Sequence, residues 1–198
     1  LEILRNIRAA LEPGGVVPAA VGFWDRFPPQ THYAIEAARW LYDTGCGPEV
    51  IGAVAAKSHN QARLNPLAAR RSDNAVTTED VLAARMVSDP LTVRDCCLVT
   101  DGGGAIVMVR SERARDFPKP PVYVLGSAAE STHRQISQMP DFTVTAARES
   151  GARAFAAAGV TPSDIDVVEL YDAFTINTIL FLEDLGFCGK GASMLGTS

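Results

Sequence analysis

Apolar side chains recur with a helical period in the first half of the chain. Residues 32–44 are predicted to form a helix that ends at Gly45, a typical C-terminal cap. The apolar positions on one face of this helix are Tyr33, Ala37, Trp40 and Leu41. A second helix is predicted to open at Pro48, because the first turn tolerates proline, and to run to about Lys57. A shorter helix is expected near residues 3–11.

Four further helices are predicted along the rest of the chain. The Thr77 hydroxyl can cap a helix that carries Val81, Leu82 and Met86 and that stops at Asp89-Pro90. A longer helix is predicted over 142–158, where Gly159 supplies a left-handed cap. A brief helix is expected at 111–116, and a last helix over 173–185.

Short runs of apolar residues predict strands between these helices. The four runs are Cys96–Val99, Ala105–Val109, Val122–Leu125 and Ile165–Leu170. In the first two runs the apolar character is continuous rather than alternating, which is typical of strands buried on both faces. The order of strands and helices favours an α/β layered fold. The proline-rich stretch 116–121 is the best candidate for a linker.

Composition and charge exclude several classes of protein. A formal net charge of −5 leaves no sequence-wide footprint for nucleic acid. No apolar run approaches the roughly 20 residues of a membrane span, and no signal peptide opens the chain. None of Cys46, Cys96, Cys97 and Cys188 forms a C-x-x-C pair, so no metal site is predicted. Free thiols suit a reducing compartment, and we expect a cytoplasmic protein.

The candidate chemistry lies where the last predicted strand meets the last helix. Tyr171 falls at the carboxyl end of that strand, the edge where open α/β sheets bind ligands. A phenol there can donate a hydrogen bond or a proton, and the start of the helix offers N–H groups to an oxyanion. The structural alternative is equally concrete, because Asp172 could only cap the helix and Tyr171 could only be a packing aromatic.

A series of short motifs, in order, resembles the sterol-carrier-type and archaeal-type branch of the thiolase superfamily. The junction Tyr171-Asp172-Ala173-Phe174 resembles the His-Asp-(Cys/Ala)-Phe of that branch, and Asp95-Cys96 with Asp101-Gly102 resembles its Asp-Cys-x-x-x-x-Asp-Gly segment. The remaining similar segments are Asn65-Pro66 with Ala62, 78–87, Asp89-Pro90-Leu91, 158–166 and 185–188. The match covers roughly residues 22–191, and the order and spacing of its pieces make it specific.

The resemblance implies a thiolase-like α/β fold with two related β-α-β-α lobes, incomplete here. Residues 1–118 would be the remainder of the N-terminal lobe, with a coenzyme-binding excursion at 32–93, and residues 119–198 the start of the C-terminal lobe. The chain is expected to be an interior piece of the fold. Full-length relatives form homodimers, and some pair with a small OB-fold protein that carries a zinc ribbon.

The implied function is making or breaking carbon–carbon bonds on acyl-coenzyme A thioesters, as in acetyl-CoA acetyltransferases. The coenzyme A thioester is then the substrate, and no covalently bound cofactor is expected. Tyr171 is the candidate catalytic residue, and Ser127, Asp172 and Phe174 are candidate substrate contacts. Four basic residues could meet the coenzyme's phosphates, but a solvated helix face is the preferred interpretation for them. These are Lys57, Arg63, Arg70 and Arg71.

The departures from the family pattern keep alternatives open. The nucleophilic cysteine of a thiolase is expected to precede residue 1, because Cys96 and Cys97 lie in a predicted buried strand and Cys188 is interpreted as structural. The late His-Pro-x-Gly and Cys-x-Gly segments are not in the sequence. Tyrosine at position 171 resembles thiolase-like aldolases that cleave hydroxyacyl-CoA side chains. A retro-aldolase and a non-catalytic subunit of a complex are therefore the two alternatives.

Overall fold

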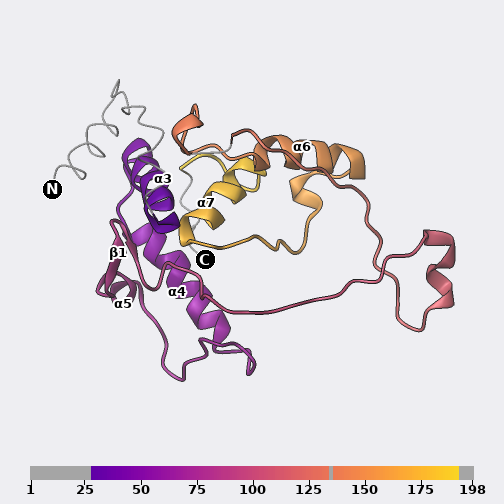
Figure 1. The fold of residues 1–198 in the computed structure, drawn as a ribbon, viewed down its shortest axis with the longest axis horizontal. Helices are drawn as coiled ribbons and strands as arrows, with labels where there is room; N and C mark the ends of the chain where they lie inside the picture. The colour runs from indigo at the N-terminus through magenta and orange to yellow at the C-terminus, as the bar shows by residue number, and fades with distance from the viewer. Residues whose placement is uncertain (1–27, 134–135, 192–198) are drawn as a thin grey trace.

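The structure is a computed structural model, and it describes residues 28–133 and 136–191. Three helices form its centre: α3 (Pro29–Thr44), α4 (Glu49–Ala62) and α7 (Thr175–Asp184). Figure 1 shows α7, from the far end of the chain, beside α3 and α4, with α6 (Ala147–Ala158) along its outer side. The helix expected near residues 3–11 lies outside the described residues.

The remaining elements of the fold are short. They are α5 (Thr78–Leu82), β1 (Met86–Ser88), β2 (Leu91–Thr92) and the 3₁₀ turns η1 (Ser111–Asp116), η2 (Ile136–Gln138) and η3 (Pro162–Asp164). Strands β1 and β2 pair in an antiparallel hairpin, which is the whole of the sheet within the described ranges.

The local signals in the sequence placed the helices well. Gly45 and Gly159 adopt the left-handed conformation at the ends of α3 and α6, as predicted. Thr77 and Asp80 form a reciprocal capping box, but α5 ends at Leu82. The predicted extension of α5 to Met86 is wrong, because that residue begins β1 and pairs with Thr92. Helix α4 is longer than predicted, and α6 begins later, at Ala147.

The main core lies between α3, α4 and α7. Its bulkiest buried side chains are Trp40, Leu91, Ile176, Ile179 and Leu180. The indole N–H of Trp40 donates to both carboxylate oxygens of Glu183, at 3.0 and 3.1 Å. This buried pairing ties α3 to α7 across a sequence separation of 143 residues, and it satisfies both groups where water is excluded.

A second polar contact attaches α6 to α7. The Asp184 carboxylate accepts from the backbone N–H and the hydroxyl of Thr145, at 2.6 and 2.8 Å. The Arg148 guanidinium pairs with the same carboxylate at 3.1 Å. Because the Asp184 side chain is fully buried, these partners offset the desolvation of its charge.

The predicted buried strands do not form. Residues 98–110, 121–130 and 166–172 have no strand partner, and we call them the unpaired segments. Of the Cys96–Val99 run, only Cys96 pairs, in an isolated antiparallel bridge with Phe174. A helix satisfies its backbone within its own turns, whereas a strand requires a neighbour, and the described residues supply none here. In Figure 1 the first unpaired segment runs far from the helices to η1.

Candidate functional site

The entry into α7 is built from two distant parts of the chain. The Cys97 N–H donates to the Ala173 carbonyl at 2.9 Å, and the Thr175 N–H donates to the Asp95 carbonyl at 3.0 Å. Residues 95–97 therefore lie antiparallel to 173–175 and satisfy a first-turn donor of α7. This pairing fixes the chain immediately after Tyr171.

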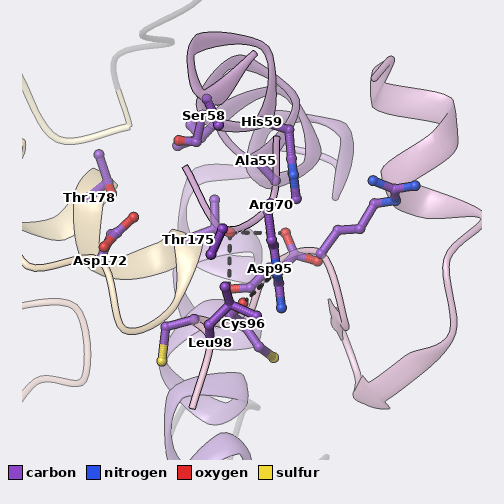
Figure 2. Close-up of a pocket in the computed structure, with 15 residues that line it drawn as sticks. Ala55, Ser58, His59, Arg70, Asp95, Cys96, Leu98, Asp172, Thr175 and Thr178 are labelled. Atoms are coloured by element: carbon purple, nitrogen blue, oxygen red, sulfur yellow. Dashed lines mark hydrogen bonds between the residues drawn. The ribbon is translucent and has the colours of Figure 1, made fainter. Parts of the chain in front are cut away.

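The Asp95 side chain stabilises the same junction through its own hydrogen bonds. It is buried, and its Oδ2 accepts from the Thr92 N–H at 2.8 Å and from the Thr92 hydroxyl at 2.7 Å. Its Oδ1 accepts from the Thr175 hydroxyl at 3.1 Å. Figure 2 shows the Thr175 hydroxyl joined to Asp95 by two bonds, one to the carboxylate and one to the backbone carbonyl. A buried carboxylate with three donors holds β2 and α7 in one arrangement.

A pocket of about 250 Å³ opens beside this junction. Helix α4 forms one wall, the start of α7 another, and residues 94–98 the floor (Figure 2). Its main polar side chains are Ser58, His59, Arg70, Arg94, Asp172 and Thr178. A second pocket of about 500 Å³ shares His59, Arg70 and Arg94, so these three side chains stand between two hollows.

The shared wall is basic. The Arg70 guanidinium donates to the Cys96 carbonyl at 3.1 Å, which holds it at the pocket rather than on a solvated helix face as expected. Burial, together with the positive charges of Arg94 and Arg70, lowers the pKa of His59, although its bond to the Arg94 backbone and the charge of Asp95 oppose this. Near neutral pH the imidazole is therefore uncharged, and the positive charge at this wall comes from the two arginines.

The other two predicted arginines stabilise the loop after α4 instead. Arg63 donates to the Asp73 carbonyl at 2.9 Å, and Arg71 pairs with the Asp73 carboxylate at 3.5 Å. Neither lines the pocket. Lys57 is exposed on α4.

The four predicted site residues fall in different surroundings. Tyr171 is 73% exposed, so its hydroxyl is not sealed in the core. Asp172 lines the pocket, whereas Phe174 is buried and stacks on Tyr33 with ring centroids 4.5 Å apart. Ser127 is exposed, next to Gly126, which approaches the backbone of α6. The structure thus brings Asp172 to the pocket, whereas Tyr171, Phe174 and Ser127 do not line it.

Two local expectations about this junction are wrong. Asp172 does not cap the helix, because α7 begins at Thr175 and no side chain caps it. The helix start is also less open than predicted, since the N–H groups of Thr175 and Asn177 are taken by the carbonyls of Asp95 and Phe174. Side-chain groups rather than these N–H groups are left to meet a ligand.

The adjacent cysteines are not a buried strand core. Cys97 is exposed and lines the pocket, and Cys96 is half-buried with its thiol donating to the Thr92 carbonyl. Burial, with the nearby negative charge of Asp95, raises the pKa of the Cys96 thiol, which disfavours its thiolate. All four cysteines are free.

Sequence reasoning missed Asp95, Arg94 and Tyr33 as parts of this site. The Asp-Cys motif was a signal for Asp95, but its partner Thr175 lies 80 residues away and no local pattern pairs them. The sequence pattern places Tyr33 only on a helix face. Within the ranges that the structure describes, no group of three acidic, histidine or cysteine side chains is placed to hold a metal ion. The described helices include none that is long and apolar enough to cross a membrane.

Comparison with known proteins agrees with the motifs. Residues 128–195 match the thiolase C-terminal domain-like family. An acetyl-CoA acetyltransferase of Methanothermobacter thermautotrophicus is 40% identical over 160 residues, which are 80% of this chain and 41% of that protein. A steroid side-chain-cleaving aldolase of Thermomonospora curvata is 36% identical over 173 residues, 82% of this chain and 43% of the relative.

A solved structure gives the same result for the fold. The Ltp2-ChsH2(DUF35) aldolase superposes with a TM-score of 0.80 at 33% identity, covering 92% of this chain and 50% of the other. The thiolase-like fold class predicted from the motifs is thereby confirmed. The chain spans about two fifths of the length of the curated relatives that it matches. On these residues and these likenesses, the chain belongs to the thiolase superfamily.

Proposed function

We propose that this protein makes or breaks carbon–carbon bonds on acyl-coenzyme A thioesters. One observation carries the proposal: the Tyr171–Phe174 junction is held rigidly by Asp95 and Cys97 while the Tyr171 side chain stays exposed. A rigid backbone with an accessible phenol is what positions a proton donor against a substrate. Tyr171 would protonate or hydrogen-bond the thioester enolate, or the hydroxyl group that reacts.

The basic wall of the pocket supports coenzyme A as the anionic part of the substrate. Arg70 and Arg94 would meet its phosphates, because guanidinium groups bind phosphate oxygens with paired hydrogen bonds. Asp172 would contact the substrate from the opposite wall. Phe174 does not line the pocket and would act only indirectly, by stacking on the ring of Tyr33. Ser127 remains a proposed contact of the pantetheine arm, resting on its position in the sequence alone.

Two chemistries fit this proposal, and relatives of both kinds match the chain. The acetyltransferase relative favours Claisen condensation or thiolysis, which in thiolases requires a cysteine nucleophile. The aldolase relatives favour retro-aldol cleavage of a hydroxyacyl-CoA, for which a tyrosine at position 171 is the specific support. An enolate is formed in each case, so the proposed role of Tyr171 is common to both.

The names of two relatives support a role within a complex. One is an aldolase named together with a DUF35 protein, and another is subunit BbsB of benzoylsuccinyl-CoA thiolase from Thauera aromatica. We propose a homodimer, with a small OB-fold and zinc-ribbon protein as a further partner. A non-catalytic subunit would bind that partner and yet turn over no thioester.

The direct test is a Tyr171→Phe variant, with Tyr123→Phe as the control at another exposed tyrosine. Loss of a positioned proton donor should lower kcat by about 100-fold or more, while the control keeps the wild-type value. Thiolysis of an acyl-CoA and cleavage of a hydroxyacyl-CoA are assayed in parallel to separate the two chemistries. Wild-type turnover in Tyr171→Phe would remove the tyrosine from the mechanism. Calorimetry with acetyl-CoA that gives no binding heat would reject the substrate class.

A further inference from the structure

One histidine lies between the two pockets. His59, in the last turn of α4, lines both of them together with Arg70 and Arg94. In Figure 2, His59 and Arg70 lie on the same side of the first pocket. The second pocket is the larger, at about 500 Å³ against about 250 Å³. A ligand that extends from one pocket into the other therefore contacts all three side chains.

The second pocket carries an excess of positive charge. Its charged side chains are Arg70, Arg94 and Asp80, so two guanidinium groups accompany one carboxylate. The Asp80 carboxylate already accepts from the Thr77 N–H, at 2.9 Å, in the capping box of α5. Among the described residues, neither arginine forms a salt bridge. Because the whole chain has a formal net charge of −5, this local excess of positive charge points to a site for an anion.

The first pocket differs from the second in its charge. Asp95 and Asp172 balance the two arginines there. Val54 and Ala55 of α4 form an apolar part of its wall. Asp172 also places this pocket next to Tyr171, the proposed proton donor. A coenzyme A thioester would thus keep its phosphates at the second pocket and extend its uncharged pantetheine arm through the first pocket toward Asp172.

His59 can become a third cation at this wall. Burial, with the charges of Arg94 and Arg70, lowers the pKa of His59, so the ring is neutral near pH 7 before a ligand binds. A phosphate group bound between these side chains adds negative charge beside the ring. That charge favours the imidazolium form, in which both ring nitrogens carry an N–H that can donate.

The other titratable groups near His59 keep their charge whether or not a phosphate is bound. They come from α5, from the residues after β2 and from the segment before α7. These groups are Asp80, Asp95, Asp172 and the thiols of Cys96 and Cys97. Lys57, on the same helix, lines neither pocket. The phosphate is therefore the added charge that changes the protonation of the ring.

We propose that His59 is a phosphate-binding residue of the coenzyme site, which joins Arg70 and Arg94 and takes up a proton from solvent as the phosphates bind. The inference rests on the proposed function, and it adds to it a third contact with the anionic end of the substrate and an orientation for that substrate. Coenzyme affinity then rises as the pH falls into the range where His59 is charged only in the complex. At higher pH the ring is neutral in both states, and its contribution is lost.

Calorimetry with coenzyme A at pH 7 tests the proton uptake. Titrations in two buffers of different ionisation enthalpy give the number of protons taken up. The wild-type protein should take up roughly half a proton more per coenzyme than His59→Gln, because an opposite charge nearby raises the pKa of a histidine. Glutamine stays neutral and is a good helix former. The comparison between variants is needed because a phosphate monoester itself titrates near about pH 6. The control is His133→Gln, since His133 lines neither pocket.

The affinities should follow the same pattern. His59→Gln should weaken the binding of coenzyme A by about 10-fold at pH 6.5 and by less than about 2-fold at pH 8.5. Pantetheine, which has no phosphate, should bind wild type and His59→Gln equally at both pH values. An equal loss of coenzyme affinity at the two pH values would indicate a packing effect and would overturn the inference.

A measurement on the wild-type protein covers the case in which His59→Gln does not fold. The chain has three histidines, and the ring signal of His59 is assigned by elimination with His32→Gln and His133→Gln. Coenzyme A should raise the pKa of His59, and pantetheine should leave it in place. An unchanged pKa of His59 with saturating coenzyme A would contradict the proton uptake.

The outcomes separate this inference from the proposed function. If coenzyme A binds with the same proton uptake in wild type and His59→Gln, the role of His59 is overturned and the function stands. If pantetheine binds as tightly as coenzyme A, the basic wall does not hold the phosphates, and the orientation fails while the proposed role of Tyr171 stands. If coenzyme A does not bind the wild-type protein, both proposals fail.

Discussion

Two isoleucines, one in a helix and one in an unpaired segment, differ greatly in the exposed fraction of their side chains. Ile179 in α7 is 2% exposed and packs among α3 and α4, whereas Ile106 in the first unpaired segment is 90% exposed. The sequence around Ile106 is as apolar as that around Ile179. The difference is that α7 closes its own backbone hydrogen bonds and needs only one face covered, while the unpaired segment lacks a neighbouring strand.

The most direct way to test this comparison is to truncate both side chains. Ile179→Ala should lower the free energy of unfolding by about 3–4 kcal/mol, because it leaves a cavity in the core. Ile106→Ala should change it by less than about 0.5 kcal/mol, since its side chain is already in water. Urea denaturation measures both values. Equal losses would mean that Ile106 is buried in the protein in solution.

The junction between the helical core and the first unpaired segment depends on Asp95. Asp95→Ala should lower the free energy of unfolding by about 3 kcal/mol, because donors of Thr92 and Thr175 lose a buried charged acceptor. Asp95→Asn should cost less, since the amide oxygen still accepts. Denaturation of the two variants gives the difference, and hydrogen exchange at the Thr175 N–H reports on the junction. A loss under about 1 kcal/mol for Asp95→Ala would contradict this role.

The half-buried carboxylate of Glu36 on α3 should respond to pH unlike one in an unpaired segment. Burial raises the pKa of Glu36 from 4.5 to about 7. The folded state therefore binds more protons than the unfolded state between these values, and the free energy of unfolding falls as pH rises through this range, then levels off. At pH 8, Glu36→Gln should be more stable than wild type by on the order of 2 kcal/mol.

The matched control for Glu36 is Glu169→Gln, at an exposed position in the third unpaired segment. Its stability should follow the wild-type pH dependence, including the fall between pH 4.5 and about 7. Denaturation at a series of pH values distinguishes the two variants. A Glu36→Gln protein that still loses stability as steeply as wild type would show that the Glu36 carboxyl is not the source.

Helices were predictable because their signals are local. The capping box of Thr77 and Asp80 joins residues three apart, and Gly45 and Gly159 end their helices by backbone conformation alone. The error at Met86 has the same origin, because a three-residue strand pairs with a partner across a turn and leaves little periodic signal.

The candidate site was predictable only in part. The Tyr171–Phe174 motif and its place before a helix were found from the sequence, as was the superfamily. Asp95 as the support of that junction, Arg70 at the pocket and Tyr33 against Phe174 were not. Each is a contact between residues far apart in the chain, and residue spacing along a sequence carries no information about such pairs.

By itself, then, the sequence determined that the helices form, that Gly45 and Gly159 end two of them, which faces they bury and which family motifs follow one another. The tertiary structure decided which apolar runs pair with another segment and which side chains contact one another at the start of α7. The physical reason is that a helix completes its hydrogen bonds within a few residues, whereas strands, buried carboxylates and stacked rings depend on groups supplied from elsewhere in the chain.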